Sequence, residues 1–84
     1  MKIEKRSEGR KITVRLSGVF QAEHLGELTE QLQDHGPLFV LDLEEVTVVD
    51  AEVVRFFGAC EANGVKIVHC PRYIREWMNR ERKP

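Results

Sequence analysis

The sequence predicts one small α/β domain over residues 1–84, with a four-stranded mixed sheet and three helices. Apolar runs of strand length alternate along the chain with segments in which apolar residues recur every three or four positions. The resulting order is strand, strand, helix, strand, helix, strand, helix, which is typical of an α/β domain. A chain of 84 residues has room for one hydrophobic core, so we expect no second domain.

The N-terminal segment, residues 2–18, predicts a β-hairpin. Ile12, Val14 and Leu16 alternate with charged or polar residues, which is the pattern of a half-buried strand. The tetrapeptide SEGR at residues 7–10 supplies the turn. We therefore expect an antiparallel hairpin at one edge of the sheet.

Two later runs, LFVLDL at 38–43 and VKIVHC at 65–70, predict further strands. Both runs are nearly continuous in apolar residues, which is typical of strands that are covered on both faces. The helical segments between the strands are long enough for right-handed crossovers, and such crossovers connect parallel strands. Residues near 12–16, 38–43 and 65–69 should therefore form mutually parallel strands.

Three segments predict helices. Leucines recur at helical spacing in residues 21–37, and Gly36 with Pro37 marks the end of that helix. A second helix should run over residues 50–63, and a third over 71–83, with a proline at its first helical position. The periodicities place eight residues in the core: Leu28, Leu32, Phe39, Leu41, Val53, Phe57, Ile67 and Ile74.

The composition, 42% hydrophobic and 32% charged, is that of a globular domain. The N-terminal sequence lacks the apolar run of a signal peptide, and no run reaches the ~20 residues of a transmembrane span. We therefore expect a cytoplasmic protein with no membrane partner. Cys60 and Cys70 are too few for a disulfide framework, so we expect both as reduced thiols.

The net charge of −1 conceals three blocks of opposite sign. Residues 1–15 carry +4, residues 21–63 carry −9 and residues 64–84 carry +4. Such blocks either steer a partner electrostatically or neutralise each other where the basic ends lie beside the acidic middle. We expect the second arrangement.

The stretch VTVVDAEVVRFF, residues 46–57, contains the turn between a strand and the second helix. Together with the turns at 18–21 and 69–72, it should lie at the carboxyl edge of the sheet, where ligands of such folds usually bind. Asp50 is placed to cap the helix, and Glu52 in the first turn is favoured by the helix dipole. Asp50, Ala51 and Glu52 carry neither a hydroxyl nor a thiol, so any chemistry of this turn must come from these carboxylates or from the surface around them.

The helical wheel of residues 50–63 separates a core face from an outward face. Val53, Val54, Phe57 and Cys60 face the core. The outward face holds few charges for a solvated helix, which fits either a surface for contact with another protein or a helix that is half-covered within a small domain. We name Asp50, Ala51, Glu52, Arg55, Phe56 and Ala59 as the candidate partner-binding residues. Glu61 falls on the apolar side of this wheel, and we expect fraying near the end of the helix to release it.

Three parts of the sequence resemble the STAS domain, the fold of bacterial anti-sigma factor antagonists. LSGVFQAEHLGELTEQL is similar to the first strand-turn-helix of the family, and LFVLDLEEVTVVDAEVVRFF is similar to its strand, loop and regulatory helix. NGVKIVHCPRYIREWM is similar to the strand and helix that follow. The spacing of Gly18, Asp42 and Asp50 carries the resemblance, and Asp50 matches the Asp that opens the Asp-Ser-Ser-Gly motif of the family. The resemblance implies signalling and transcription regulation through an anti-sigma factor or kinase-like partner.

Two departures from the family pattern concern the phosphorylation switch. In phosphoregulated members, the second hydroxyl residue after the motif Asp accepts phosphate, whereas here Ala51, Glu52 and Val53 follow Asp50. The motif Asp50, Ala51, Glu52, Val53 is therefore degenerate, and we expect no switching by serine phosphorylation. Family members also commonly carry Asp three residues after the matched Gly18, where this chain has Gln21.

Other functions are less well supported by the sequence. The main alternative is a small thiol-dependent enzyme or redox protein that uses Cys70, which lies at a predicted helix start beside His69. A metal site from Cys60, His69 and Cys70 lacks a recognisable ligand spacing, and we expect no metal and no cofactor. Arginines at 72, 75 and 82 could form a basic ridge for nucleic acid, but the acidic middle block argues against this partner.

Overall fold

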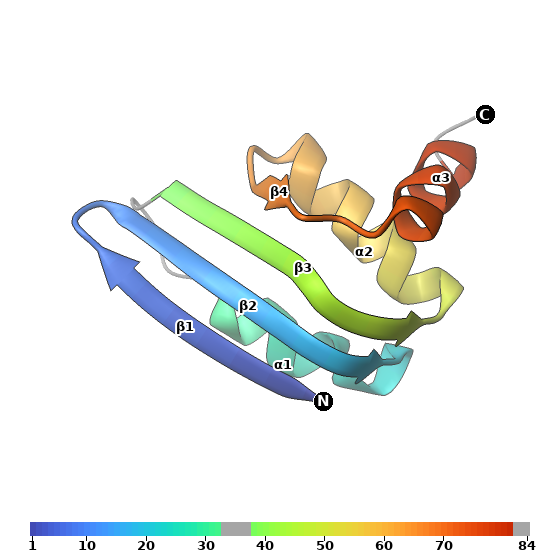
Figure 1. Ribbon diagram of the computed structural model, residues 1–84, viewed down its shortest axis with the longest axis horizontal. Coiled ribbons are helices and arrows are strands. Elements are labelled where there is room, and N and C mark those ends of the chain that lie inside the picture. Colours follow the sequence, from blue (N-terminus) through green and yellow to red (C-terminus); the bar gives the residue numbers. More distant parts are fainter. Residues whose placement is uncertain (33–37, 82–84) are drawn as a thin grey trace.

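The chain folds into a four-stranded sheet with helices, and strands alternate with helices along the sequence after the N-terminal hairpin (Figure 1). The computed structural model describes residues 1–32 and 38–81, so the predicted stop signal at Gly36 and Pro37 lies outside the described residues. The elements are β1 (Lys2–Glu8), β2 (Lys11–Phe20), the 3₁₀ helix η1 (Ala22–His24), α1 (Leu25–Gln31), β3 (Leu38–Val49), α2 (Ala51–Ala62), β4 (Lys66–Val68) and α3 (Arg72–Glu81).

The sheet has the order β1-β2-β3-β4. β1 pairs antiparallel with β2, whereas β2 with β3 and β3 with β4 are parallel. This arrangement confirms the predicted mixed sheet, the three helices and the single compact domain. It also confirms that the hairpin supplies the antiparallel edge.

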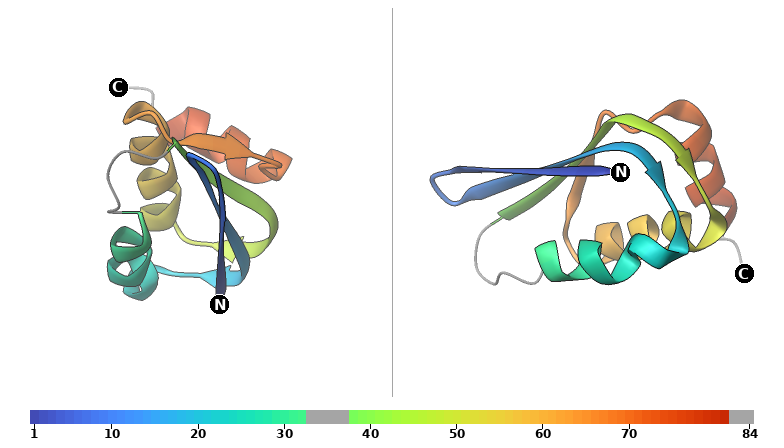
Figure 2. Two further views of the ribbon diagram at one scale, coloured as in Figure 1. Left: turned by 90° about the vertical axis from the view of Figure 1, so that its left-hand side faces the viewer. Right: turned by 90° about the horizontal axis from the view of Figure 1, so that it is seen from below.

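The sheet is strongly curved and wraps around the helices (Figure 2). The pairing of β2 with β3 shifts register between Arg15 and Ser17 and again between Gly18 and Val19. Such bulges bend strands, which explains why the carboxyl halves of β2 and β3 curl over the helical layer. The bend directs the carboxyl ends of both strands toward the starts of η1 and α2.

The core lies between the concave face of the sheet and the helices. Six of the eight predicted core residues are buried, which confirms those assignments, whereas Leu32 and Ile67 are only partly buried and lie against the core. The prediction that residues 65–70 form a fully buried strand was wrong. β4 is a three-residue strand at the sheet edge, and its Lys66 is exposed. An edge strand has a neighbour on one side only, so its side chains stay partly accessible.

Two ion pairs join α2 to α3. The Arg75 guanidinium donates to the carboxylate of Glu61 at 2.9 Å, and the Nε of Arg55 donates to Glu81 at 2.7 Å. The expectation that Glu61 is released by fraying was therefore wrong, because a cation on α3 holds this carboxylate where the helices meet. The pair with Glu61 also raises the pKa of Arg75.

The start of α3 differs slightly from the prediction. Arg72 is the first helical residue, and the carbonyl of Pro71 accepts from the amides of Ile74 and Arg75, both at 3.0 Å. Pro71 therefore stands one position before the helix. Within residues 1–32 and 38–81, no helix has the length and apolar character needed to cross a membrane.

We predict that Phe57→Ala lowers the free energy of unfolding by about 3–5 kcal/mol, because the ring is fully buried and its removal leaves a cavity. Leu38→Ala is the control, since Leu38 is 55% exposed and its replacement should cost less than about 1 kcal/mol. Urea denaturation of both variants measures the difference. Equal midpoints for the two variants would contradict the placement of Phe57 in the core.

Candidate functional site

Asp50 joins two turns at the carboxyl edge of the sheet. Its backbone is extended, and its side chain caps α2 by accepting a hydrogen bond from the Val53 amide at 3.0 Å. The second carboxylate oxygen accepts from the amide of Ala22 at 2.8 Å, at the start of η1. A single carboxylate therefore fixes the start of α2 and also ties it to the turn that follows β2.

These two amides also control the ionisation of Asp50. Hydrogen bonds to a carboxylate stabilise its charged form. The bond from Ala22 has the largest effect, followed by the bond from Val53, and together they lower the pKa of Asp50 below its ordinary value. The two hydrogen bonds, which we call the Asp50 clamp, are therefore strongest when Asp50 is ionised.

The three turns at this edge converge, as the sequence predicts. The bond between Ala22 and Asp50 joins the first two, and the Tyr73 hydroxyl of α3 donates to the Thr47 carbonyl at 2.7 Å, which joins the third. Gly18, matched in the family resemblance, has a φ of +89°. A side chain is strained in this conformation, so glycine is needed where β2 bends toward Asp50.

The candidate partner-binding residues lie on α2 largely as the helical wheel predicts. Glu52, Arg55 and Ala59 are exposed, whereas Phe56 and Ala51 are half-buried. Val53 of the degenerate motif is fully buried and belongs to the core, so it cannot reach a partner. Arg55 is paired with Glu81, as described above, which leaves Glu52 as the charge at the helix start that is directed to solvent.

An apolar groove of about 230 Å³ runs between α1 and α2. Phe56, Ala59 and Cys60 of α2 line one wall, and Leu32 and Val65 contribute further apolar surface. The groove continues the outward face of α2 toward α1. The sequence could not indicate it, because the helical wheel of one helix contains no information about the neighbouring helix.

The cysteines are in environments that favour the neutral thiol. Burial raises the pKa of Cys60 to about 11. Burial also raises the pKa of Cys70, although the nearby Arg75 partly offsets this effect. The Cys70 thiol donates weakly to the carbonyl of Pro71 at 3.6 Å. The thiolate needed for nucleophilic chemistry is therefore disfavoured at both positions.

The structure pairs His69 with a residue that sequence reasoning did not connect to it. Its Nδ1 lies 3.3 Å from a carboxylate oxygen of Asp42, which also accepts from the Glu44 amide at 3.0 Å. His69 has a positive φ of 53°, which turns it away from the strand direction, while Cys70 packs against the core. Among the described residues, no group of three or more His, Cys, Asp or Glu side chains could hold a metal ion.

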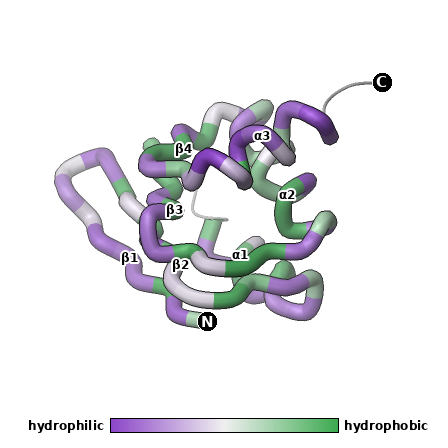
Figure 3. Tube along the Cα trace, turned by 45° about the vertical axis from the view of Figure 1, so that its right-hand side comes forward, coloured by the Kyte–Doolittle hydropathy of each residue, from purple (hydrophilic) through white to green (hydrophobic). Residues whose placement is uncertain are grey.

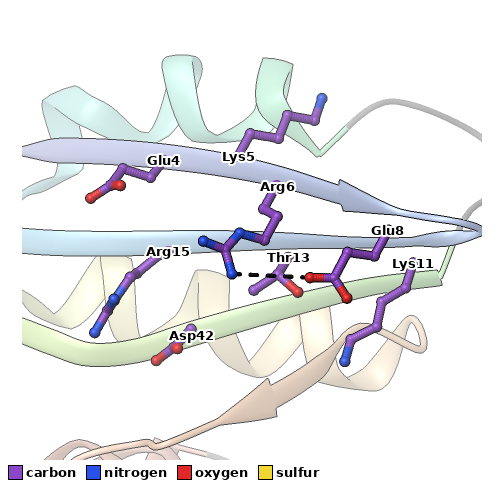
Figure 4. Close-up of a pocket in the computed structure, with 8 residues that line it drawn as sticks. All are labelled: Glu4, Lys5, Arg6, Glu8, Lys11, Thr13, Arg15 and Asp42. Atoms are coloured by element: carbon purple, nitrogen blue, oxygen red, sulfur yellow. Dashed lines mark ion pairs between the residues drawn. The ribbon is translucent and has the colours of Figure 1, made fainter.

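A second, shallow cavity of about 430 Å³ lies on the convex face of the sheet, opposite the helices (Figure 4). Charges of both signs line it, from β1, β2 and β3: Glu4, Lys5, Arg6, Glu8, Lys11, Arg15 and Asp42, together with Thr13. The mixed charges do not select a ligand of one sign. We therefore place the candidate site on α2 and its groove.

We predict that the stabilising effect of Asp50 depends on pH. Because its pKa is lowered by folding, the contribution is fully present above the ordinary carboxyl pKa of about 4 and is lost as the pH falls through the lower folded value. Asp50→Asn should reduce the urea midpoint at about pH 7, and the difference from the wild type should shrink in acid.

Glu52→Gln is the matched control, because it removes the neighbouring exposed carboxylate and leaves the clamp in place. The urea midpoint of Glu52→Gln should change with acidification in parallel with the urea midpoint of the wild type. A constant difference between Asp50→Asn and the wild type from about pH 7 to pH 3 would contradict the assigned role of the charge.

The chain is similar in structure to one part of a larger protein. No protein-family model matches the chain, and no curated protein matches it either. Seven chains of solved structures match, among them one described as "Crystal Structure Analysis of Mglu". That structure is 26% identical over 82% of this chain, with a TM-score of 0.53. This chain spans 19% of its length, so the similarity concerns one part of a much larger protein.

Proposed function

We propose that the chain is a non-enzymatic protein-interaction module that binds a protein partner through the outward face of α2. The observation that carries this proposal is that α2 has both an N-terminus fixed by hydrogen bonds and a face exposed to solvent. Asp50 clamps the start, and Glu52 and Ala59 are exposed on the face behind it. A preorganised surface loses little conformational freedom on binding, which favours affinity.

The groove beside α2 supplies the apolar part of such an interface. Protein interfaces usually combine an apolar centre with a polar rim. Here Phe56, Ala59 and Leu32 form an apolar centre, and Glu52 with Arg55 forms a charged rim. The partner should therefore insert an apolar side chain between α1 and α2.

The resemblance to the STAS family suggests the kind of partner. We infer an anti-sigma factor or kinase-like regulator, in a bacterial partner-switching system or a related assembly. Glu52 occupies the position of the phosphorylatable hydroxyl. It carries one negative charge, whereas phosphoserine carries about 1.5 to 2, so Glu52 imitates the phosphorylated state permanently but incompletely. The module would then be held in one state without a kinase.

We predict that Glu52→Ser tightens partner binding by roughly two- to fivefold, the effect of one exposed charge. The direction follows from the family, in which phosphorylation generally weakens the hold on the anti-sigma partner. The partner is first recovered by affinity capture from the source cell, and titration calorimetry then measures its affinity for both forms. Thermal melts should show nearly unchanged stability, because Glu52 is exposed.

Two control variants separate the role of this surface from that of net charge. Glu30→Ser makes the same charge change at an exposed position of α1 and should leave the affinity unchanged. Ala59→Arg places a large side chain on the proposed contact and should weaken binding roughly tenfold or more. Equal affinities for the wild type, Glu52→Ser and Ala59→Arg would exclude α2 as the binding surface.

A further inference from the structure

β1 forms an edge of the sheet that no other described element covers (Figure 1). It pairs with β2 on one side only, so half of its backbone N–H and C=O groups point away from the sheet. All of its seven residues are exposed except Ile3, which is half-buried, and none is proline. The strand is therefore able to pair with a further strand.

The charges of β1 alternate in sign along one face. Because Lys2, Glu4, Arg6 and Glu8 are alternate residues, their side chains share a face of the strand. They lie on the convex face, where three of them line the charged cavity (Figure 4). Figure 3 shows that β1 is hydrophilic along most of its length.

The geometry points to a second copy of this chain as the partner of that edge, paired antiparallel and centred on Lys5. In this register Lys2 lies opposite Glu8 of the second copy, and Glu4 lies opposite Arg6 of the second copy. Two-fold symmetry repeats both contacts, so all four charges on the convex face meet the opposite sign. Cross-strand pairs of opposite charge stabilise a sheet, and an isologous contact of this kind closes as a dimer.

Neighbouring registers that keep the helices of both copies on one side of the sheet are unfavourable. Centring the pairing on Glu4 places Glu4 opposite itself and Lys2 opposite Arg6. Centring it on Arg6 places Arg6 opposite itself and Glu4 opposite Glu8. Like charges directly opposite each other are destabilising, so the sign pattern favours the register centred on Lys5 over these two neighbours.

The free chain already contains weak pairs that the dimer would supplement. The Lys2 ammonium lies 3.6 Å from a carboxylate oxygen of Glu4, and the Arg6 guanidinium lies 4.0 Å from one of Glu8. All four side chains are exposed. Exposed pairs of this kind contribute little, so they do not compete strongly with cross-strand contacts. At the two-fold axis the two copies of Lys5 face each other, which costs energy. Seven residues also bury a small area, so the dimer should be weak and dependent on concentration.

Sedimentation of the full chain over a range of concentrations tests the inference. The mass should rise from 9.7 kDa toward twice that value as the concentration increases. Added salt should favour the monomer, because the pairs are exposed and screened. A mass that stays at one chain up to millimolar concentration in low salt would overturn the proposal.

Charge reversals on β1 test the register. Glu4→Arg places two arginines opposite each other at both symmetric positions, and Arg6→Glu places two glutamates there. Each single variant should dimerise roughly tenfold or more weakly than the wild type. The double variant Glu4→Arg/Arg6→Glu restores opposite signs and should recover the dimer. Weak single variants together with a recovered double variant are the pattern that the register centred on Lys5 predicts.

Glu27→Arg is the matched control, because it reverses one exposed charge on α1 and leaves the charges of β1 unchanged. It should dimerise like the wild type. Single variants that still form the wild-type dimer, or a double variant that stays as weak as the singles, would each overturn the pairing. Circular dichroism confirms that every variant is folded. This edge is separate from α2, so the result does not depend on the proposed function.

Discussion

The carboxylate of Asp50 is the contact on which the functional end of the molecule depends. It accepts from the amides of Ala22 and Val53, so the turn after β2 and the start of α2 have one common anchor. Without this anchor the first turn of α2 would have an unpaired amide, and the curled end of β2 would lose a tie to the helical layer. Because this cap sets where α2 begins, it also places Glu52 in the first turn of the helix, where the side chain is exposed.

Ion pairs across the fold neutralise the three charge blocks of the sequence. The guanidinium of Arg15, in the basic N-terminal block, lies 3.1 Å from a carboxylate oxygen of Glu44 and 3.5 Å from one of Glu45, both in the acidic block. Arg75 in the basic C-terminal block pairs with Glu61. These contacts support the expectation that the blocks neutralise each other. They also leave less free positive charge on α3 for nucleic acid, since Arg72 pairs with Glu76, while Arg82 lies outside the described residues.

The sequence predicted the order and type of the elements, because periodicity reports which face of an element is buried, and the lengths of the crossovers predicted the parallel direction of the strands. It also predicted the cap at Asp50, which depends on a contact three residues away. Contacts between distant segments were not predictable in this way. The amide of Ala22 on Asp50 and the pair of Asp42 with His69 depend on how the strands curve and shift register. Glu61 was misjudged for the same reason, because its partner Arg75 belongs to another helix.

The amide signals of Ala22 and Val53 report directly whether one ionised carboxylate holds both turns. Nuclear magnetic resonance spectra recorded from about pH 7 into acid follow both amides as Asp50 takes up a proton. The two signals should shift together, with one common midpoint below the ordinary pKa of a carboxyl group. Signals that shift with separate midpoints, or an Ala22 signal that does not respond while Val53 does, would contradict the shared anchor.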